Sequence, residues 1–109
     1  MAFDEKLAER VRSVLKRRRG VSEKKMFGGL AFLVNGHMAC GIIGDDLMVR
    51  VGPETYEEAL KKPGARPMDF TGRAMKGMVY VGPRSIRRAS SLETWVERGL
   101  SYARSLPPK

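Results

Sequence analysis

The sequence KMFGGLAFLV, at residues 25–34, is the longest apolar run in the chain, and Asn35-Gly36 follows it directly. Successive side chains of a strand point to opposite faces, and both faces of this run are apolar. A strand of this kind is usually central in its sheet and covered on both sides. A buried helix is the alternative, but each Gly costs about 1 kcal/mol inside a helix, and Asn-Gly is a strong hairpin signal. The run is therefore predicted to be the first strand of a hairpin.

Two further strands are predicted beyond this turn. Met38–Ile43 returns as the second strand, Gly44-Asp45-Asp46 turns the chain again, and Leu47–Val51 forms the third strand. Alternate residues of the third strand are apolar, which fits a strand with one buried face. These segments predict an antiparallel meander.

A helix is predicted on the N-terminal side of the meander, from about Phe3 to Arg19. Its apolar residues recur at spacings of three and four, which places them on one stripe. Acidic residues open the helix and basic residues end it, and this arrangement complements the helix dipole at both ends. Gly20 then offers a residue that can take a positive φ after the last turn.

Two more helices are predicted in the C-terminal half. A short helix has Pro53 at its first position and ends at Lys61-Lys62-Pro63-Gly64, because Pro63 disfavours further helical turns. A longer helix covers about Ser91–Ser105 and has one apolar stripe. Ser90, with Glu93 three residues later, has the spacing of a capping box.

Two short strands are predicted between these helices, at Arg66–Phe70 and Met75–Val81. Pro67 cannot donate a backbone hydrogen bond, which places its strand at a sheet edge or at a strand start. The predicted element order is therefore helix-strand-strand-strand-helix-strand-strand-helix.

The length and composition bound the class of protein. A chain of 109 residues with 42% hydrophobic residues has room for one core, so residues 1–109 are predicted to form a single domain. Its one cysteine, Cys40, excludes an intrachain disulfide and fits a reducing cytosol. The start of the chain is polar, unlike a signal peptide, and the apolar runs fall well short of the roughly 20 residues of a membrane span. We expect a soluble cytoplasmic protein with no membrane partner.

The chain is strongly basic, with a formal net charge of +9. Such a balance favours nucleic acid or an acidic protein as a partner, although charge also serves solubility alone. The candidate anion-binding or partner-binding residues fall into two clusters: Lys16, Arg17, Arg18 and Arg19, and then Arg84, Arg87 and Arg88. The first cluster is either a solvated helix end or a phosphate-contacting patch. A platform for stacking bases would require aromatic residues among the basic ones, and this cluster has none. We therefore favour the interpretation as a solvated helix end.

Few residues could support catalysis or bind a metal. His37 and Cys40 have an H-x-x-C spacing, but residues three apart on a strand are expected to point to opposite faces, and no second ligand pair exists for zinc. Gly28-Gly29 lacks the pattern of a phosphate-binding loop, so these glycines are expected to let a helix pack close to the sheet or to form a bulge. We expect no enzyme activity, no catalytic residues, no metal and no cofactor.

Six methionines lie in or beside the predicted strands: Met26, Met38, Met48, Met68, Met75 and Met78. Methionine fills irregular gaps in cores, and flexible methionine surfaces also bind adaptable partners. Both interpretations stay open, and ordinary core packing is favoured.

Particular segments, together with the element order, resemble a known family. They are Lys25–Gly29, Asp46–Val51, Pro67–Phe70, Gly77–Val81 and the helix that carries Trp95. With these segments, the chain from Phe3 to Leu106 resembles the N-terminal domain of the TfoX/Sxy family. The resemblance implies a two-layer α+β fold, with helices packed on an antiparallel sheet, similar to secretion-chaperone-like folds.

The resemblance also implies a role. Named members of the family regulate natural competence and are similar to co-activators that work with the cyclic-AMP receptor protein at promoters. Those regulators carry a further helical domain of helix-hairpin-helix kind, so this chain is expected to be a stand-alone N-terminal domain. The family supplies no agreed catalytic residues.

Two functions of different classes follow from these observations. The favoured one is a non-enzymatic regulatory or adaptor domain that binds a protein, such as a transcription regulator or a second copy of the chain. The alternative is a direct nucleic-acid binder that uses the two basic clusters.

Overall fold

The computed structural model describes residues 3–26, 28–67 and 77–107 of the chain. The helices are α1 (Glu5–Leu15), α2 (Tyr56–Leu60) and α3 (Ala89–Ser105), with a 3₁₀ turn, η1 (Pro83–Ile86), before α3. The strands are β1 (Val21–Met26), β2 (Gly29–Val34), β3 (His37–Ile43), β4 (Asp46–Arg50), β5 (Ala65–Pro67) and β6 (Met78–Val81).

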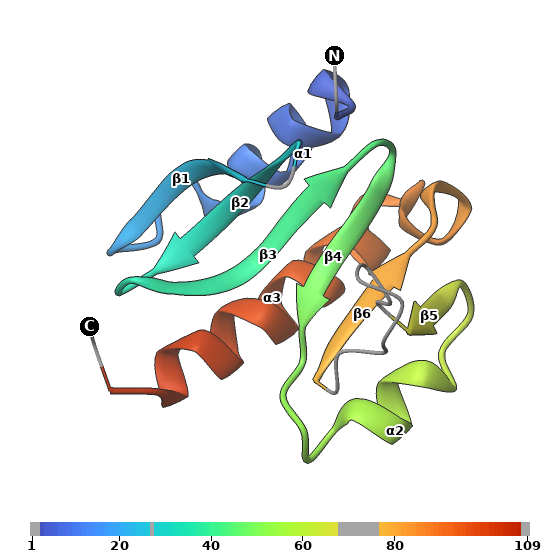
Figure 1. The fold of residues 1–109 in the computed structure, drawn as a ribbon. Coiled ribbons are helices and arrows are strands. Elements are labelled where there is room, and N and C mark those ends of the chain that lie inside the picture. Colours follow the sequence, from blue (N-terminus) through green and yellow to red (C-terminus); the bar gives the residue numbers. More distant parts are fainter. Residues whose placement is uncertain (1–2, 27, 68–76, 108–109) are drawn as a thin grey trace.

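The six strands form one antiparallel sheet in the order β1-β2-β3-β4-β6-β5 (Figure 1). α1 and α3 run side by side behind this sheet, and α3 contacts β3 and β4 most extensively. The predicted α+β fold, with helices packed on an antiparallel sheet, is confirmed. Among the helices of the described residues, none is long and apolar enough to cross a bilayer.

The run at residues 25–34 is two strands rather than one. The chain turns through Gly28, whose φ is +75°, so that Val21–Met26 pairs with Gly29–Val34. The prediction missed β1 because its sequence, VSEKKM, lacks the period-two apolar pattern of a half-buried strand. The sheet consequently has four strands before α2 instead of three. The next turn is as predicted, since Asn35 and Gly36 both have positive φ and join β2 to β3.

The helices cover one face of β2. Leu30, Phe32 and Val34 are buried in the main core, together with residues of α1 and α3. The alternate residues Ala31 and Leu33 belong to the opposite face, against which no helix of the described segments packs. Ala31 is nevertheless fully buried and Leu33 is half-buried, so both faces of β2 are largely covered, as predicted, although among the described helices the packing is on one face alone.

A smaller apolar cluster lies on that opposite face. Met48 and Met78 are buried there, with Met38, Ile43 and Tyr80 packed partly against them. These two methionines fill gaps on the sheet, in keeping with the favoured interpretation. Met68 and Met75 lie outside the described residues.

Several predicted boundaries were wrong by a few residues. α1 ends at Leu15 rather than Arg19; Lys16 and the three arginines after it are exposed, and the Arg18 amide donates to the carbonyl of Leu15 in the turn that follows. Its first turn is capped by Asp4, which accepts hydrogen bonds from the backbone amides of Lys6 and Leu7. Gly20 has a positive φ, but it lies in the turn before β1 rather than directly after the helix.

The later helices also start elsewhere. α2 begins at Tyr56, because Pro53 lies in a turn, and the Thr55 hydroxyl donates to the carbonyl of Val51. α3 begins at Ala89, so that Ser90 lies inside the helix and the capping box is wrong. Arg88 is the N-cap residue and makes no side-chain capping bond.

The C-terminal strands keep their predicted order. β5 is the edge strand, as Pro67 indicated, but its description stops at Pro67, and 68–70 lie outside the described residues. β6 starts at Met78, and the predicted residues 75–76 also lie outside them.

Candidate functional site

The first basic cluster follows the end of α1. Lys16, Arg17, Arg18 and Arg19 are all exposed. The Arg18 guanidinium donates to the Glu97 carboxylate of α3 and forms an ion pair with it. Part of this cluster is therefore already neutralised by the neighbouring helix.

The second basic cluster surrounds the start of α3. Arg84 lies in η1, and Arg87 and Arg88 follow it; all three side chains are exposed. Arg10 of α1 fixes the backbone of this segment, because its Nη2 donates to the carbonyl oxygens of Ile86, at 2.6 Å, and Arg87, at 3.1 Å.

The structure does not bring the two clusters together. Arg10 contacts the segment just before Ala89, whereas Arg18 contacts Glu97, eight residues into α3. At 1.5 Å per residue these contact points are about 12 Å apart along the helix. Glu93 lies between them, against the Arg10 side of α1. The surface of the α1–α3 pair thus alternates in sign.

Two residues of the second cluster line a pocket that the sequence did not reveal. Arg84 and Arg88 line a hollow of about 590 Å³ together with Lys62, which follows α2, and Arg98, in the third turn of α3. We call these four residues the cationic pocket. The remaining lining residues are Pro63, Ser85, Ser90, Ser91, Thr94 and Trp95. Lys62 and Arg98 were missed because they are far apart in the sequence, and only the fold places them beside the second cluster.

One carboxylate offsets part of the charge of the cationic pocket. Glu58 of α2 accepts from the Arg98 guanidinium and lies 3.7 Å from the Nζ of Lys62. The hydrogen bond from Arg98 is the main reason that the pKa of Glu58 lies below its ordinary value. Arg98 also covers the Trp95 ring, with 5.4 Å from its guanidinium carbon to the ring centroid. Within the described ranges, Arg84 and Arg88 have no acidic partner.

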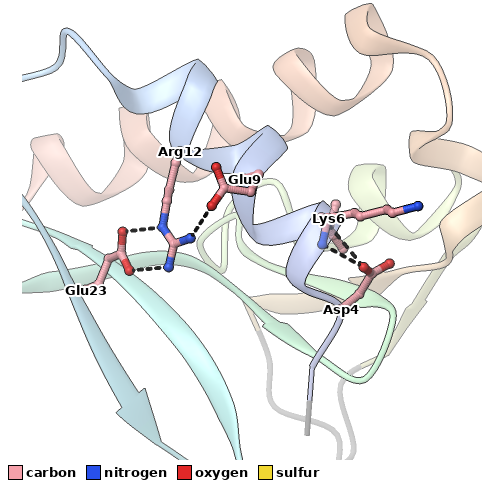
Figure 2. Close-up of polar contacts among 6 residues, drawn as sticks. Asp4, Lys6, Glu9, Arg12 and Glu23 are labelled. Atoms are coloured by element: carbon pink, nitrogen blue, oxygen red, sulfur yellow. Dashed lines mark hydrogen bonds and ion pairs between the residues drawn. The ribbon is translucent and has the colours of Figure 1, made fainter. Parts of the chain in front are cut away.

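A separate ion-pair network joins α1 to the edge strand β1 (Figure 2). Arg12 donates through Nε and Nη2 to the two carboxylate oxygens of Glu23, at 2.8 and 2.9 Å, and through Nη1 to Glu9, at 3.0 Å. These bonds lower the pKa of Glu23 and raise that of Arg12. The network fixes helix to sheet and leaves little free charge to bind a partner.

His37 and Cys40 lie on the same side of the sheet, contrary to the prediction. β2 and β3 pair Phe32 with Cys40 but Leu33 with Met38, so that Ala39 is an extra residue, a β-bulge. This extra residue reverses the alternation and turns both side chains toward the helices.

A backbone carbonyl contacts one of these two residues, and burial shields the other. The His37 Nε2 lies 2.6 Å from the carbonyl oxygen of Pro107, just after α3. Cys40 is fully buried, and burial raises the pKa of its thiol to about 12. Within residues 3–26, 28–67 and 77–107, no group of three or more His, Cys, Asp or Glu residues could hold a metal ion.

The part of the chain that forms these elements matches the sequence model of a protein family. The model of the TfoX N-terminal domain matches residues 13–103, from the last turn of α1 almost to the end of α3. The chain belongs to the TfoX N-terminal domain family. This makes it, in general terms, a domain of the competence-regulator type. Neither a curated protein nor a solved structure matches the chain. The similarity to secretion-chaperone-like folds stays a prediction.

Proposed function

We propose that the chain is a non-enzymatic regulatory or adaptor domain that acts through protein–protein contacts, with a transcription regulator as its partner. The observation that carries the proposal is the separation of the two basic clusters along the α1–α3 pair. A duplex or a single strand presents a continuous line of phosphates, and proteins that bind it without sequence preference present a matching basic stripe. Here Glu93 and Glu97 interrupt the positive surface, and Glu97 pairs with Arg18.

A surface of alternating sign suits a folded protein partner. Complementary patterns of charge select the partner and fix its register, and each interrupted patch contributes to that selection. The state of the only His and the only Cys also supports a non-enzymatic role. His37 is held at a backbone carbonyl, and the thiolate of Cys40 is disfavoured by burial.

The test combines partner capture with direct binding. The chain is used to isolate partners from competent and from stressed cells, and each captured protein is purified and titrated by calorimetry. We expect saturable binding to one transcription regulator, weakened about tenfold when Glu97 is replaced by Lys. The matched control is Glu57→Lys, which makes the same charge change at an exposed residue of α2 without an ion pair in the described structure.

Nucleic acid is titrated in parallel. Binding to duplex or single-stranded oligonucleotides at about 50 mM salt, with an affinity that falls steeply as salt increases, would contradict the proposal in favour of the nucleic-acid binder. Replacement of Arg17, Arg18 and Arg19 by Ala would then flatten the salt dependence. Turnover of a small molecule would contradict the proposal that the domain is non-enzymatic. Light scattering during purification measures the molar mass and so tests whether a second copy of the chain is a partner.

A further inference from the structure

We propose that the cationic pocket, formed by Lys62, Arg84, Arg88 and Arg98, binds the phosphate group of a phosphorylated small molecule. This inference does not rest on the proposed protein partner, and it adds a ligand site to the domain.

The first support is the convergence of charge. Lys62 follows α2, Arg84 lies in η1, Arg88 is the N-cap residue of α3, and Arg98 lies within α3, so four cations from separate parts of the sequence line one hollow. Like charges gathered in this way repel one another, and a concave surface concentrates their field. An anion bound in the hollow would relieve that repulsion.

The second support is the incomplete neutralisation. Glu58 is the acidic partner of both Lys62 and Arg98, and in the described part of the chain Arg84 and Arg88 have none. The pocket therefore has about three positive charges in excess of its carboxylate. A phosphate monoester carries nearly two negative charges at pH 7 and matches this excess better than a carboxylate does.

The third support is the kind of polar group that lines the hollow. Guanidinium and ammonium groups only donate hydrogen bonds, and arginine can bind two phosphate oxygens at once. The hydroxyls of Ser85, Ser90 and Ser91 add further donors. Thr94 contributes less, because its hydroxyl already donates to the carbonyl of Ser90. Such a set of donors suits a ligand whose charged end has acceptors alone.

The carboxylate beside the hollow and the covered tryptophan ring favour a small molecule over a polymer. The volume of the hollow, about 590 Å³, exceeds what inorganic phosphate needs and lies in the usual range of ligand pockets. Glu58 beside Lys62 and Arg98 disfavours a chain of successive phosphates. Trp95 is 6% exposed and lies under Arg98, so it offers no open face on which a base could stack. Recognition therefore centres on one phosphate group.

Trp95 also supplies the measurement, because it is the only tryptophan of the chain and lines the pocket. The full chain is titrated with inorganic phosphate, ribose 5-phosphate and unphosphorylated ribose at constant ionic strength. Trp95 fluorescence and calorimetry report binding. We expect both phosphate probes to bind saturably, ribose 5-phosphate more tightly than inorganic phosphate, and ribose not at all.

Two double variants with equal charge change distinguish a site from general attraction. Arg84→Ala with Arg88→Ala is expected to weaken binding of ribose 5-phosphate at least tenfold. Arg17→Ala with Arg19→Ala, at exposed residues of the other cluster, is expected to change it less than twofold. Circular dichroism is used to check that both variants are folded.

Three results would overturn the inference: no saturable response to either phosphate probe, equal weakening in both double variants, or binding of a single-stranded oligonucleotide without binding of ribose 5-phosphate. The last result would assign the pocket to nucleic acid. Failure to find a protein partner leaves these outcomes unchanged, so the two proposals fail separately.

Discussion

Gly99 of α3 lies directly against the backbone of Ala39 in β3. A Cβ atom at Gly99 would stand 2.2 Å from the carbonyl oxygen of Ala39 and 2.9 Å from its carbonyl carbon. Ala39 is the extra residue of the bulge and is fully buried. The longest helix, α3, therefore crosses the sheet at the β-bulge of β3. The absence of a side chain at Gly99 permits this close approach.

Gly99→Ala is expected to lower the free energy of unfolding by about 1–3 kcal/mol, the usual cost of overpacking a core. An Ala residue gains about 1 kcal/mol over Gly in helix propensity, but the atom that it meets is a backbone oxygen, which cannot rotate away. Urea unfolding followed by Trp95 fluorescence measures the change.

Ser101→Ala is the matched control for this substitution. Ser101 is an exposed residue of the same helix, and the change is expected to stay within about 0.5 kcal/mol. A Gly99→Ala protein at least as stable as the wild type would show that α3 moves away from Ala39 at little cost.

Local signals predicted much of this fold. Asn35-Gly36 predicted the turn between β2 and β3 because few residue pairs accept positive φ at both positions. The apolar stripe of α3 and the edge position of Pro67 also follow from periodicity and from a missing backbone donor. Each of these signals lies within a few residues of sequence.

The errors concern features that depend on distant segments. β1 is polar, and only its pairing with β2 and the contact of Glu23 with Arg12 make it a strand of this sheet. The two predicted roles of Gly28-Gly29, close helix packing or a bulge, were both wrong, because Gly28 forms a turn and Gly29 packs on the backbone of Ile42. Helix packing uses Gly99 instead.

The candidate site was predicted only in part, because it too depends on segments that are distant in the sequence. Arg84 and Arg88 stand out in the sequence as a basic cluster, but Lys62 and Arg98 lie beside them only after folding. The bulge at Ala39, which turns His37 and Cys40 to one side, has no sequence signal of its own.

The Arg12–Glu23 pair predicts a pH dependence of stability. The pKa of Glu23 is lowered in the folded chain, chiefly by the hydrogen bond from Arg12. A lowered pKa stabilises the fold above the unfolded pKa, and this contribution is lost as the pH falls through the folded value, below about 4.5. Both side chains are about one-third exposed, so the pair is expected to contribute only about 0.2–1 kcal/mol.

Glu23→Gln tests this expectation by urea unfolding at several pH values. Wild type should be more stable than Glu23→Gln at pH 7, and the difference should shrink as the pH is lowered below about 4.5. Glu57→Gln, at an exposed residue without an ion pair in the described structure, should show no such trend. A stability difference between wild type and Glu23→Gln that grows as the pH is lowered would show that folding raises the pKa of Glu23 instead of lowering it.

Arg10 is expected to stabilise the junction between α1 and α3. Its guanidinium holds the carbonyl oxygens of Ile86 and Arg87, and hydrogen bonds from a charged donor contribute about 1.5–3 kcal/mol when buried. Because this contact is partly exposed, Arg10→Ala should cost about 1–2 kcal/mol in urea unfolding. Arg17→Ala removes the same charge from an exposed residue and should cost less than about 0.5 kcal/mol. An equal loss of stability in the two variants would show that Arg10 contributes through its charge alone and not through its hydrogen bonds to Ile86 and Arg87.

Cys40 gives an independent measure of the same stability. Its thiol is fully buried and its pKa is raised to about 12, so the folded chain contains almost no reactive thiolate at pH 8. Alkylation by iodoacetamide should therefore be slow in the native protein and should reach one thiol per chain in denaturant.

In the native protein, labelling of Cys40 should follow transient opening. Where closing is faster than alkylation, the rate depends on the population of the open state, and each 1.4 kcal/mol of lost stability increases it about tenfold. Gly99→Ala should accelerate labelling by the factor that its urea unfolding predicts, and Ser101→Ala should not. Rapid labelling of the folded wild type would contradict the burial of Cys40 beneath α3. Acceleration without a matching loss in urea stability would show that α3 detaches from β3 while the rest of the sheet stays folded.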